Sequence, residues 1–474
     1  MPKEIPTCPP KPQSAESGKR SYDIELITPM FGGGVVNREN DVTLPIRPTA
    51  IRGQLQFWWR ATVGAQYETR QELRAAQSAI WGDTSKASSV HVRVEAVKFD
   101  NPEPCAQFER DHKDQRRYRS MASWNSPFNN TALPYALFSF QGQFAKGGRQ
   151  IETKPAACIH KVAFRLTVIC HQRIDFGNQV EPALWAWVNF GGLGSRTRRG
   201  CGAIYCQKLA PTNLESLDMW YREHVPAIGC RIRDWPTMPT QFLYFPHSGT
   251  PINQWNQVIG LFRDFRQKPG NTPGHARPPG PARSWYPEPD TIRQISECHS
   301  IGHDPSLHLS GGRPLPNGFP RAEFGLPIVF KFIDDKRGDP QRTTLHPYVG
   351  GQENNKGTAD APDIHVTGGE IKDRMASPVI LKPLALSKDN SVAIIVPMQT
   401  HRLEHVTLIG DRGVDCTPRH TVPIQDTKFV EYPHSPIRGL TTTGSALEAF
   451  LNLATQAYGT NAAHVETGYR RVSV

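Results

Sequence analysis

One short segment constrains this chain more than any other. It contains two pairs of glycines with three arginines between them: the glycines are Gly192, Gly194, Gly200 and Gly202, and the arginines are Arg196, Arg198 and Arg199. Glycine adopts positive φ and has no Cβ, so main-chain N–H groups in such a loop can approach an anion. Guanidinium groups bind phosphates through paired hydrogen bonds. The segment therefore predicts a loop that contacts nucleic-acid phosphates, and the alternative is a hairpin tip with solvated arginines.

Two familiar nucleotide-binding loops do not match this segment. A Walker A loop ends in Gly-Lys-Ser or Gly-Lys-Thr, and the segment has no such ending. In the dinucleotide-binding pattern G-x-G-x-x-G, the third glycine position is occupied by Thr197. We therefore expect the loop to bind a phosphate backbone rather than a single nucleotide.

Strands and helices alternate on both sides of this loop. Hydrophobic residues at period two predict strands, and a period near 3.6 predicts helices. The expected strands are residues 22–27, 90–95, 164–170, 203–206, 241–245, 327–332, 379–382 and 392–396. The expected helices are residues 50–61, 181–190, 255–266 and 445–458. This mixture predicts an α+β fold.

The chain is long enough for more than one hydrophobic core, and we expect two α+β domains. The first covers residues 21–210 and the second residues 211–474. A polar, proline-rich leader of residues 1–20 precedes them, and it lacks the apolar stretch of a signal peptide. Polar residues predict an insertion at about 101–153, and Pro, Gly and Arg predict another at about 268–289.

The positive charge of the chain is concentrated in its first half. The whole sequence has 55 Lys and Arg against 44 Asp and Glu, a net charge of +11. Residues 1–210 contain 28 basic and 18 acidic side chains, whereas residues 211–474 contain 27 and 26. A basic surface that binds a polyanion is therefore expected in the first domain.

The composition also predicts where the protein works. No stretch approaches the roughly 18 consecutive apolar residues of a membrane-spanning helix. The nine cysteines are scattered and odd in number, which is unlike a disulfide framework, so we expect reduced thiols. Together these features predict a cytoplasmic protein without membrane contact.

The glycine-arginine segment resembles the glycine-rich loop of the CRISPR RAMP superfamily. That loop has the pattern Gly-apolar-Gly, five residues, Gly-apolar-Gly. Four further blocks are similar to those of a particular RAMP family and occur in the same order. They are residues 27–34 and 51–61, before the loop, and residues 320–328 and 374–378, after it. The resemblance covers most of residues 22–460 and is to the first RAMP subunits of type III-B Cmr effector complexes.

The resemblance implies two ferredoxin-like, RNA-recognition-type domains and a non-catalytic subunit. Such a subunit holds the 3′ part of the crRNA and helps capture target RNA in antiviral defence, beside the RAMP backbone and large subunits. Target cleavage belongs to a different subunit. The matching blocks add further candidate RNA ligands to those of the loop: Thr28, Gly33, Arg52, Arg321 and Arg374.

Each added arginine has a structural alternative. Arg52 lies near a predicted helix start, where unpaired N–H groups also favour an anion, but it could instead be solvated or paired within the protein. Arg321 and Arg374 could equally be partners in ion pairs. Trp58 and Trp59 have the spacing of a buried helix face, so we expect them to pack rather than to stack on bases.

Two other functions remain open from the sequence. One is a metal-independent RAMP endoribonuclease that processes crRNA precursors with a histidine such as His160 or His171 as general base. The other is a protein scaffold whose arginines pair with acidic neighbours. The group Cys298, His299, His303 and His308 has zinc-binding residue types, but its spacing matches no common ligand set. We expect no metal and no cofactor.

Overall fold

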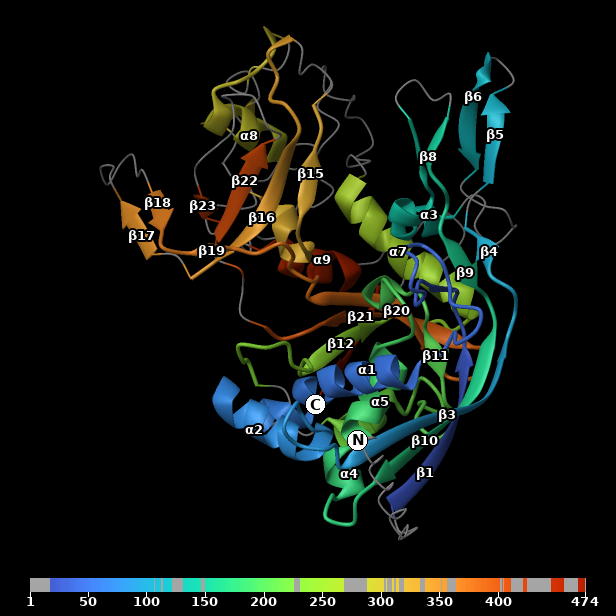
Figure 1. Ribbon diagram of the computed structural model, residues 1–474. Coiled ribbons are helices and arrows are strands. Elements are labelled where there is room, and N and C mark those ends of the chain that lie inside the picture. The colour runs from blue at the N-terminus through green and yellow to red at the C-terminus, as the bar shows by residue number, and fades with distance from the viewer. Residues whose placement is uncertain are drawn as a thin grey trace, which may run out of the picture.

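The structure is a computed structural model, and Figure 1 shows it as a ribbon. It describes residues 18–105, 107–111, 114–121, 131–145, 150–225, 231–267, 288–301, 304, 309–310, 313–314, 319–332, 337–350, 352–355, 364–400, 403, 405–410, 421–423, 445–455 and 468–473. The described residues contain two four-stranded antiparallel sheets and a five-stranded sheet, together with smaller sheets. The predicted leader lies outside these residues except for its last three positions.

The first sheet belongs to the first half of the chain. Its elements are β1 (Lys19–Leu26), α1 (Pro48–Ala61), β3 (Val90–Phe99), β10 (Val162–Cys170), α5 (Glu181–Phe190) and β11 (Ile204–Tyr205). The strand order is β11-β1-β10-β3, and every pair is antiparallel. In sequence order this is 4-1-3-2, with one helix after the first strand and one after the third. The arrangement is ferredoxin-like, as expected.

The second sheet repeats the same topology. Its elements are β12 (Gln241–Tyr244), α7 (Pro251–Gln267), β20 (Val379–Ala385), β21 (Ser391–Pro397), α9 (Ala446–Thr455) and β24 (Arg470–Ser473). The strand order is β20-β21-β12-β24, again 4-1-3-2 when read from the other edge. The expectation of two ferredoxin-like, α+β units is confirmed. The domain limits at residue 210 stay a prediction.

One hydrophobic core connects the two sheets. It includes Leu55 and Trp59 of α1, Trp187 of α5 and Ile394 of β21, all fully buried. The helices of the first unit therefore lie between its own sheet and the second sheet (Figure 1). Trp58 is only 3% exposed, so both tryptophans of α1 pack in the core, as their spacing predicted.

A second core covers the opposite face of the second sheet. Trp255 and Phe262 of α7 and Phe450 of α9 pack there against Leu381 of β20. Cys201 of the glycine-arginine segment is buried in the same core. This contact places that segment at the junction of the two ferredoxin-like units.

The second unit contains a larger insertion than the sequence predicted. A five-stranded sheet is formed by β15 (Ile328–Phe330), β16 (Thr343–Val349), β19 (Glu370–Ile371), β22 (His405–Gly410) and β23 (Thr421–Pro423). With α8 (Glu288–Ser296) and η9 (Pro320–Phe324) it has a separate small core. Short pairs flank it: β13 (Leu309–Ser310) with β14 (Arg313–Pro314), and β17 (Gln352–Asn355) with β18 (Ile364–Thr367). Of the insertion expected at 268–289, residues 268–287 lie outside the described part.

The insertion expected at 101–153 lies between β3 and β10 and has local structure. It contains β4 (Glu103–Pro104), β5 (Gln107–Asp111), β6 (Asp114–Met121), α3 (Leu133–Ala136), η4 (Phe138–Phe140), β7 (Gln143–Phe144) and β8 (Ile151–Thr153). β5 and β6 form a hairpin that extends away from the first sheet (Figure 1). β4 pairs with β9 (Ala157–Ile159), and β9 pairs with β2 (Met30–Phe31).

Further helices complete the two units. They are η2 (Val63–Gln66), α2 (Arg70–Trp81), α4 (Phe176–Gln179), η5 (Thr197–Arg199) and α6 (Leu217–His224). One of the two hydrogen bonds of the capping box predicted for the last helix is present: the Glu448 amide donates to Ser445 Oγ over 3.2 Å. The helix is described only to Thr455, short of the expected Tyr458.

Two expectations about the environment of the protein have different outcomes. Among the described residues, no helix has the length and apolar character needed to cross a membrane. The thiols of Cys105, Cys158, Cys170, Cys201 and Cys206 are free and buried. Cys298, however, is disulfide-bonded, so the expectation that every cysteine is reduced is wrong at this position.

Candidate nucleic-acid interface

The glycine-arginine loop, residues 192–202, is closed by main-chain hydrogen bonds. The Leu193 amide donates to Gly202 O over 2.8 Å, and the Gly202 amide donates to Pro29 O over 2.9 Å. Thr28 Oγ1 donates to Gly200 O over 2.6 Å and accepts from the Ala203 amide over 2.8 Å. Thr28 is 1% exposed, so its hydroxyl joins the two ends of the loop and has no surface left for RNA. This role replaces the RNA contact expected for Thr28.

The glycines of the loop are needed for close packing within the protein. Gly194, Gly200 and Gly202 have φ angles of +74°, +84° and +66°. A Cβ on Gly202 would lie 1.9 Å from Leu193 O, one on Gly194 2.3 Å from Phe31 O, and one on Gly192 2.5 Å from Gly202 O. At Gly200 the obstacle would be the Trp255 indole at 2.4 Å.

From the sequence, these glycines are expected to let an anion approach the main chain. Only Gly194 among the four is exposed, because Gly192, Gly200 and Gly202 are buried against their own chain. Tight main-chain contacts do require these glycines. At Gly192, Gly200 and Gly202 the close contact is with the protein itself and not with an anion.

Arg199 is bound inside the protein. Its Nη1 donates to Val379 O over 2.9 Å and Arg198 O over 3.3 Å, and its Nη2 donates to Ser377 Oγ over 3.0 Å and Phe324 O over 3.2 Å. The guanidinium also lies 4.8 Å from the centre of the Phe262 ring. Burial lowers the pKa of Arg199 to about 9. Arg199 thus connects the loop to the second ferredoxin-like unit, and we correct its expected role as a phosphate ligand.

Arg198 has an intermediate position. Its Nη1 donates to Ser377 O, and its guanidinium carbon lies 5.5 Å from the centre of the Phe57 ring of α1. Burial lowers the pKa of Arg198 below its usual range. The side chain bridges α1 and the residues before β20, so most of its surface contacts protein.

Arg196 is the exposed cation of the loop. It takes a left-handed conformation with φ +56°, and it directly follows the exposed residues Gly194 and Ser195. One nitrogen, Nη1, donates to Ser139 Oγ over 3.2 Å. Its Nε and Nη2 have no hydrogen-bond partner among the described residues. A guanidinium with one edge anchored and the other edge open has the geometry that binds a phosphate.

Gly33 lies close to this tip. A Cβ on the preceding Gly32 would lie 3.2 Å from Ser195 Oγ, so the two turns are in contact. Gly33 is exposed, has φ +95°, and accepts a hydrogen bond at its carbonyl from Arg47 Nη2. The structure therefore brings Gly33 and Arg196 to one surface.

Comparison with known proteins identifies the first ferredoxin-like unit. Residues 23–205 match the family model of the RAMP superfamily. This part of the chain is similar to the RAMP superfamily, and we call residues 23–205 the RAMP domain. A curated protein from Pyrococcus furiosus, named CRISPR system Cmr subunit Cmr1-2, is 25% identical over 194 residues, which are 40% of this chain and 95% of that protein.

Two solved structures show weak similarity over more of the chain. The crystal structure of Cmr1 from Pyrococcus furiosus in its apo form aligns with a TM-score of 0.38 and 13% identity, covering 86% of this chain and 94% of that one. A chain in the cryo-EM structure of the Type III-B Cmr-beta bound to cognate target RNA gives 0.39 and 10%, covering 91% and 98%.

The other predicted arginines differ in accessibility. Arg52 of the RAMP domain donates from Nη2 to Trp81 O, which ties α1 to the end of α2. Arg321 is paired with the buried Glu288, whose carboxylate also accepts from the Arg321 amide over 2.8 Å. The structural alternatives thus describe Arg52 and Arg321 better than RNA contact does. Arg374 is exposed and has no described partner, so it stays a candidate ligand.

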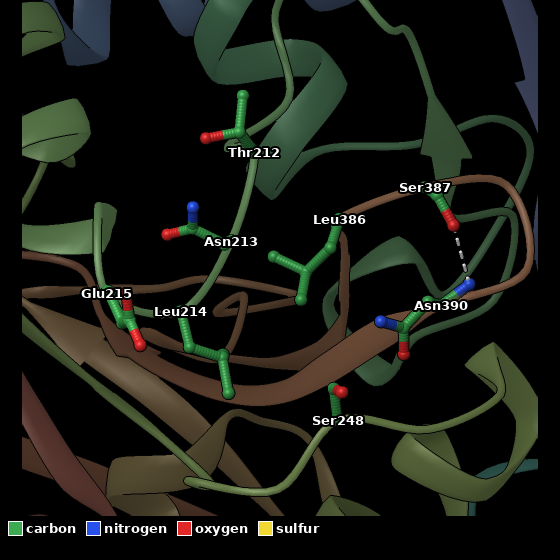
Figure 2. Close-up of a pocket in the computed structure, with 8 residues that line it drawn as sticks. All are labelled: Thr212, Asn213, Leu214, Glu215, Ser248, Leu386, Ser387 and Asn390. Atoms are coloured by element: carbon green, nitrogen blue, oxygen red, sulfur yellow. Dashed lines mark hydrogen bonds between the residues drawn. The ribbon is translucent and has the colours of Figure 1, made fainter.

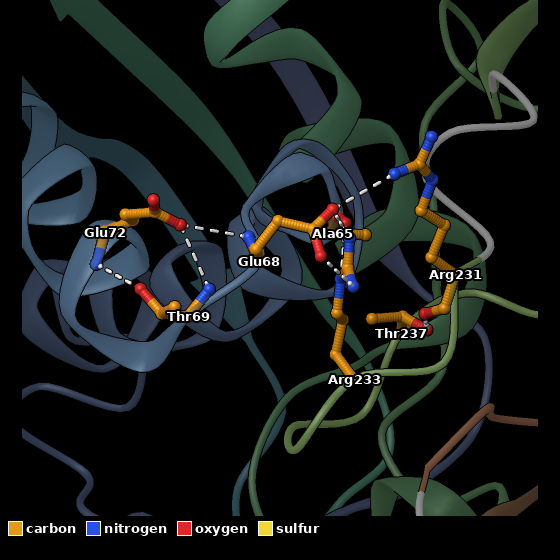
Figure 3. A network of polar contacts seen from close by, with 7 residues as sticks. All are labelled: Ala65, Glu68, Thr69, Glu72, Arg231, Arg233 and Thr237. Carbon is orange, nitrogen blue, oxygen red and sulfur yellow. Dashed lines mark hydrogen bonds and ion pairs between the residues drawn. The ribbon is translucent and has the colours of Figure 1, made fainter.

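Further arginines at the edge of the RAMP domain are neutralised by ion pairs. Figure 3 shows Glu68 between α1 and α2, facing Arg231 and Arg233 at 3.3 Å and 2.9 Å. Beside them, Thr69 and Glu72 form the capping box of α2. These contacts join the start of the second half to the RAMP domain and leave little free charge for a polyanion.

The open face of the RAMP sheet lacks the residues of an RNA-recognition domain. Such domains stack bases on aromatic side chains of the central strands. Here β1 and β10 present an ion pair, Arg165 with Asp23 at 2.9 Å, and a hydrogen bond between Ser21 and Thr167 at 3.1 Å. Exposed positions on β1, β3 and β10 hold no Phe, Tyr or Trp, and the exposed ring of His91 is on the edge strand β3. RNA contact is therefore expected at the loops and not on this sheet.

A pocket of about 380 Å³ lies at the far end of the second sheet. Figure 2 shows its lining from two segments, residues 212–215 and the β20–β21 turn, together with Ser248. Glu215 is its one ionisable side chain, so it offers no positive charge to RNA. The turn and Ser377 are at opposite ends of β20, about 30 Å apart at a rise of about 3.3 Å per residue. The pocket is separate from the loop.

The two histidines proposed as a general base lie far from each other. His160 and His171 flank the nine residues of β10 at opposite ends, a separation of about 36 Å at a rise of about 3.3 Å per residue. His160 Nε2 lies 3.5 Å from Cys158 Sγ, and burial lowers the pKa of His160. His171 Nδ1 accepts from the Arg173 amide over 3.3 Å. Within the described residues no three His, Cys, Asp or Glu side chains cluster as metal ligands, and His303 and His308 lie outside them.

Sequence reasoning missed a buried lysine next to the loop. Lys382 of β20 is 1% exposed, and its Nζ donates to Gly191 O over 2.7 Å. Burial lowers the pKa of Lys382 from 10.5 to about 7. A single lysine within the apolar strand Val379–Ala385 was a visible signal of a buried, bonded cation.

Proposed function

We propose that this protein is a non-catalytic RNA-binding subunit of a type III-B Cmr effector complex. It holds the 3′ part of the crRNA and helps to capture target RNA, alongside the RAMP backbone and large subunits, in the cytoplasm. The RAMP domain and the relative named as a Cmr subunit support membership of such a complex. The observation that carries RNA binding is the exposed guanidinium of Arg196, fixed by Ser139 and open on its other edge.

The proposed contact surface is smaller than the sequence suggested. It consists of Gly33, Gly194 and Arg196, with Arg374 as a further exposed cation. Contacts of this kind bind the phosphate backbone and carry no sequence information, so base pairing by the crRNA supplies specificity. The binding is largely electrostatic and depends steeply on salt.

The test measures RNA affinity at several salt concentrations by fluorescence anisotropy. Loss of one phosphate contact in Arg196→Ala lowers the slope of log K against log salt by about 0.7 for single-stranded RNA. The loss should be equal for unrelated RNA sequences. Arg74→Ala is the matched control, because Arg74 is an exposed arginine on α2 away from the loop. An unchanged slope for Arg196→Ala contradicts the proposed contact.

The same preparation tests the proposed absence of catalysis. Wild-type protein is incubated with labelled CRISPR repeat RNA in EDTA, and we expect intact RNA. Discrete cleavage that is lost in His160→Ala or His171→Ala would instead establish the endoribonuclease. A chain that shifts no RNA at physiological salt, alone or in its complex, would favour the protein scaffold.

A further inference from the structure

A phenylalanine next to the loop tip is left largely in solvent. Phe138 is the first residue of η4 and is 76% exposed. The third residue of the same turn, Phe140, stacks on Phe31 with ring centres 4.4 Å apart and planes 14° apart. The turn is therefore fixed by one aromatic ring while the other points away from the core.

Two arginines hold this turn in place: Arg38, and Arg196 of the proposed RNA surface. Arg38 donates to Ser139 O and Phe140 O, each over 2.8 Å, and to Lys154 O over 3.0 Å. Arg196 donates to Ser139 Oγ, and its guanidinium carbon lies 5.8 Å from the centre of the Phe140 ring. Because Phe138 directly precedes Ser139, its Cα lies about 3.8 Å from that of a residue bound by Arg196.

The segment that contains Arg38 also exposes apolar side chains. The turn of residues 34–39 is closed by the Gly34 amide, which donates to Glu39 O over 3.2 Å. Val35 and Val36 on this turn are 91% and 58% exposed. Arg38 connects this turn to η4 by hydrogen bonds. The exposed side chains of Val35 and Val36 and the open edge of Arg196 are therefore on loops that contact one another.

We propose that Phe138 is a stacking platform for one unpaired base of an RNA strand whose phosphate lies on Arg196. The inference rests on the proposed function, since it assigns a base to the strand held there. An aromatic ring beside a guanidinium is the combination that binds single-stranded RNA, because the ring takes the base and the cation takes the backbone. A base inside a continuous duplex has no free face, so the strand at this site is unpaired.

The test compares Phe138→Ala, Phe138→Trp and Arg196→Ala in the full-length chain. The probes are a short labelled single-stranded RNA and the same RNA annealed to its complement. We expect Phe138→Ala to weaken binding of the single strand by roughly 5- to 150-fold, the range for one stacked base. Phe138→Trp should retain affinity, and neither change should alter the salt slope, because no charge is lost. The duplex should bind Phe138→Ala as it binds the wild type.

The control is Met219→Ala, since Met219 is an equally apolar side chain, 62% exposed on α6. Its affinity should equal that of the wild type. If Arg196→Ala lowers the salt slope while Phe138→Ala binds RNA normally, the stacking platform is wrong and the proposed function stands. If Phe138→Ala only weakens association with other complex subunits, Phe138 contacts protein instead. If the wild type binds no RNA, both proposals fail.

Discussion

The buried Lys382 makes the stability of this protein depend on pH in a predictable way. A cation that is 1% exposed, with one carbonyl as its described partner, is poorly compensated for the water it loses. The pKa of Lys382 falls from 10.5 to about 7 in the folded protein. At about 1.4 kcal/mol per pH unit, the charged form destabilises the fold by about 5 kcal/mol.

The sign follows from proton binding in the two states. Between pH 7 and 10.5 the unfolded chain keeps the proton on Lys382 and the folded chain has released it. Stability therefore rises with pH across this window, and the full destabilisation is present below pH 7. Lys382→Met has no titratable group at this position. The free energy of unfolding of the wild type should therefore rise by about 1.4 kcal/mol per pH unit relative to that of the variant.

The assay is urea unfolding of both proteins at steps of pH from 6 to 10. In the variant, Gly191 O also loses the hydrogen bond that Lys382 donates. This loss lowers the free energy of unfolding by about 1 to 3 kcal/mol at every pH. Lys388→Met is the matched control, because Lys388 is exposed on the turn after β20. A wild-type minus Lys382→Met difference that stays constant from pH 7 to 10 would refute the reasoning.

Two further substitutions test how the loop is packed within the protein. Arg199→Ala removes the donor of four hydrogen bonds and should lower the free energy of unfolding by about 3 to 5 kcal/mol, measured in urea. An unfolding free energy within 1 kcal/mol of the wild type would count against its structural role. Gly202→Ala places a Cβ 1.9 Å from Leu193 O at φ +66° and should destabilise by more than about 4 kcal/mol. Its control is Gly53→Ala in α1, where a Cβ would meet nothing within 4 Å. This substitution should stabilise the fold by about 0.5 to 1 kcal/mol. Equal stability of the two variants would contradict the packing of Gly202.

The two ferredoxin-like units could be predicted because their strands and helices have clear local periodicity. β3 alternates apolar and polar residues from Val90 to Glu95, and α1 has its buried side chains at the spacing of one helix face. These signals are contained within about ten consecutive residues. Of the five-stranded sheet of the second unit, β15 lies within the predicted strand 327–332, whereas β16 and β22 were missed. β19 and β23 have two and three residues, too few to show a period.

The roles of individual arginines could not be predicted from local sequence. Arg199 bonds to Phe324, Ser377 and Val379, which are 125 to 180 residues away along the chain. Arg321 is paired with Glu288 across 33 residues. No pattern near an arginine shows whether a distant carbonyl or carboxylate will meet it, so the number of charged residues in a loop overestimates the number available to a ligand.

The geometry of the loop explains why its three arginines cannot act together. Thr197–Arg199 forms a turn of 3₁₀ helix, in which successive side chains are about 120° apart. Arg198 and Arg199 therefore point in different directions, one toward Phe57 and one toward Phe262. Arg196 precedes the turn in a left-handed conformation, which directs it to Ser139 at the surface. A loop that spans two ferredoxin-like units needs cations for its own anchorage, so Arg196, outside the turn, is the arginine left for the proposed RNA contact.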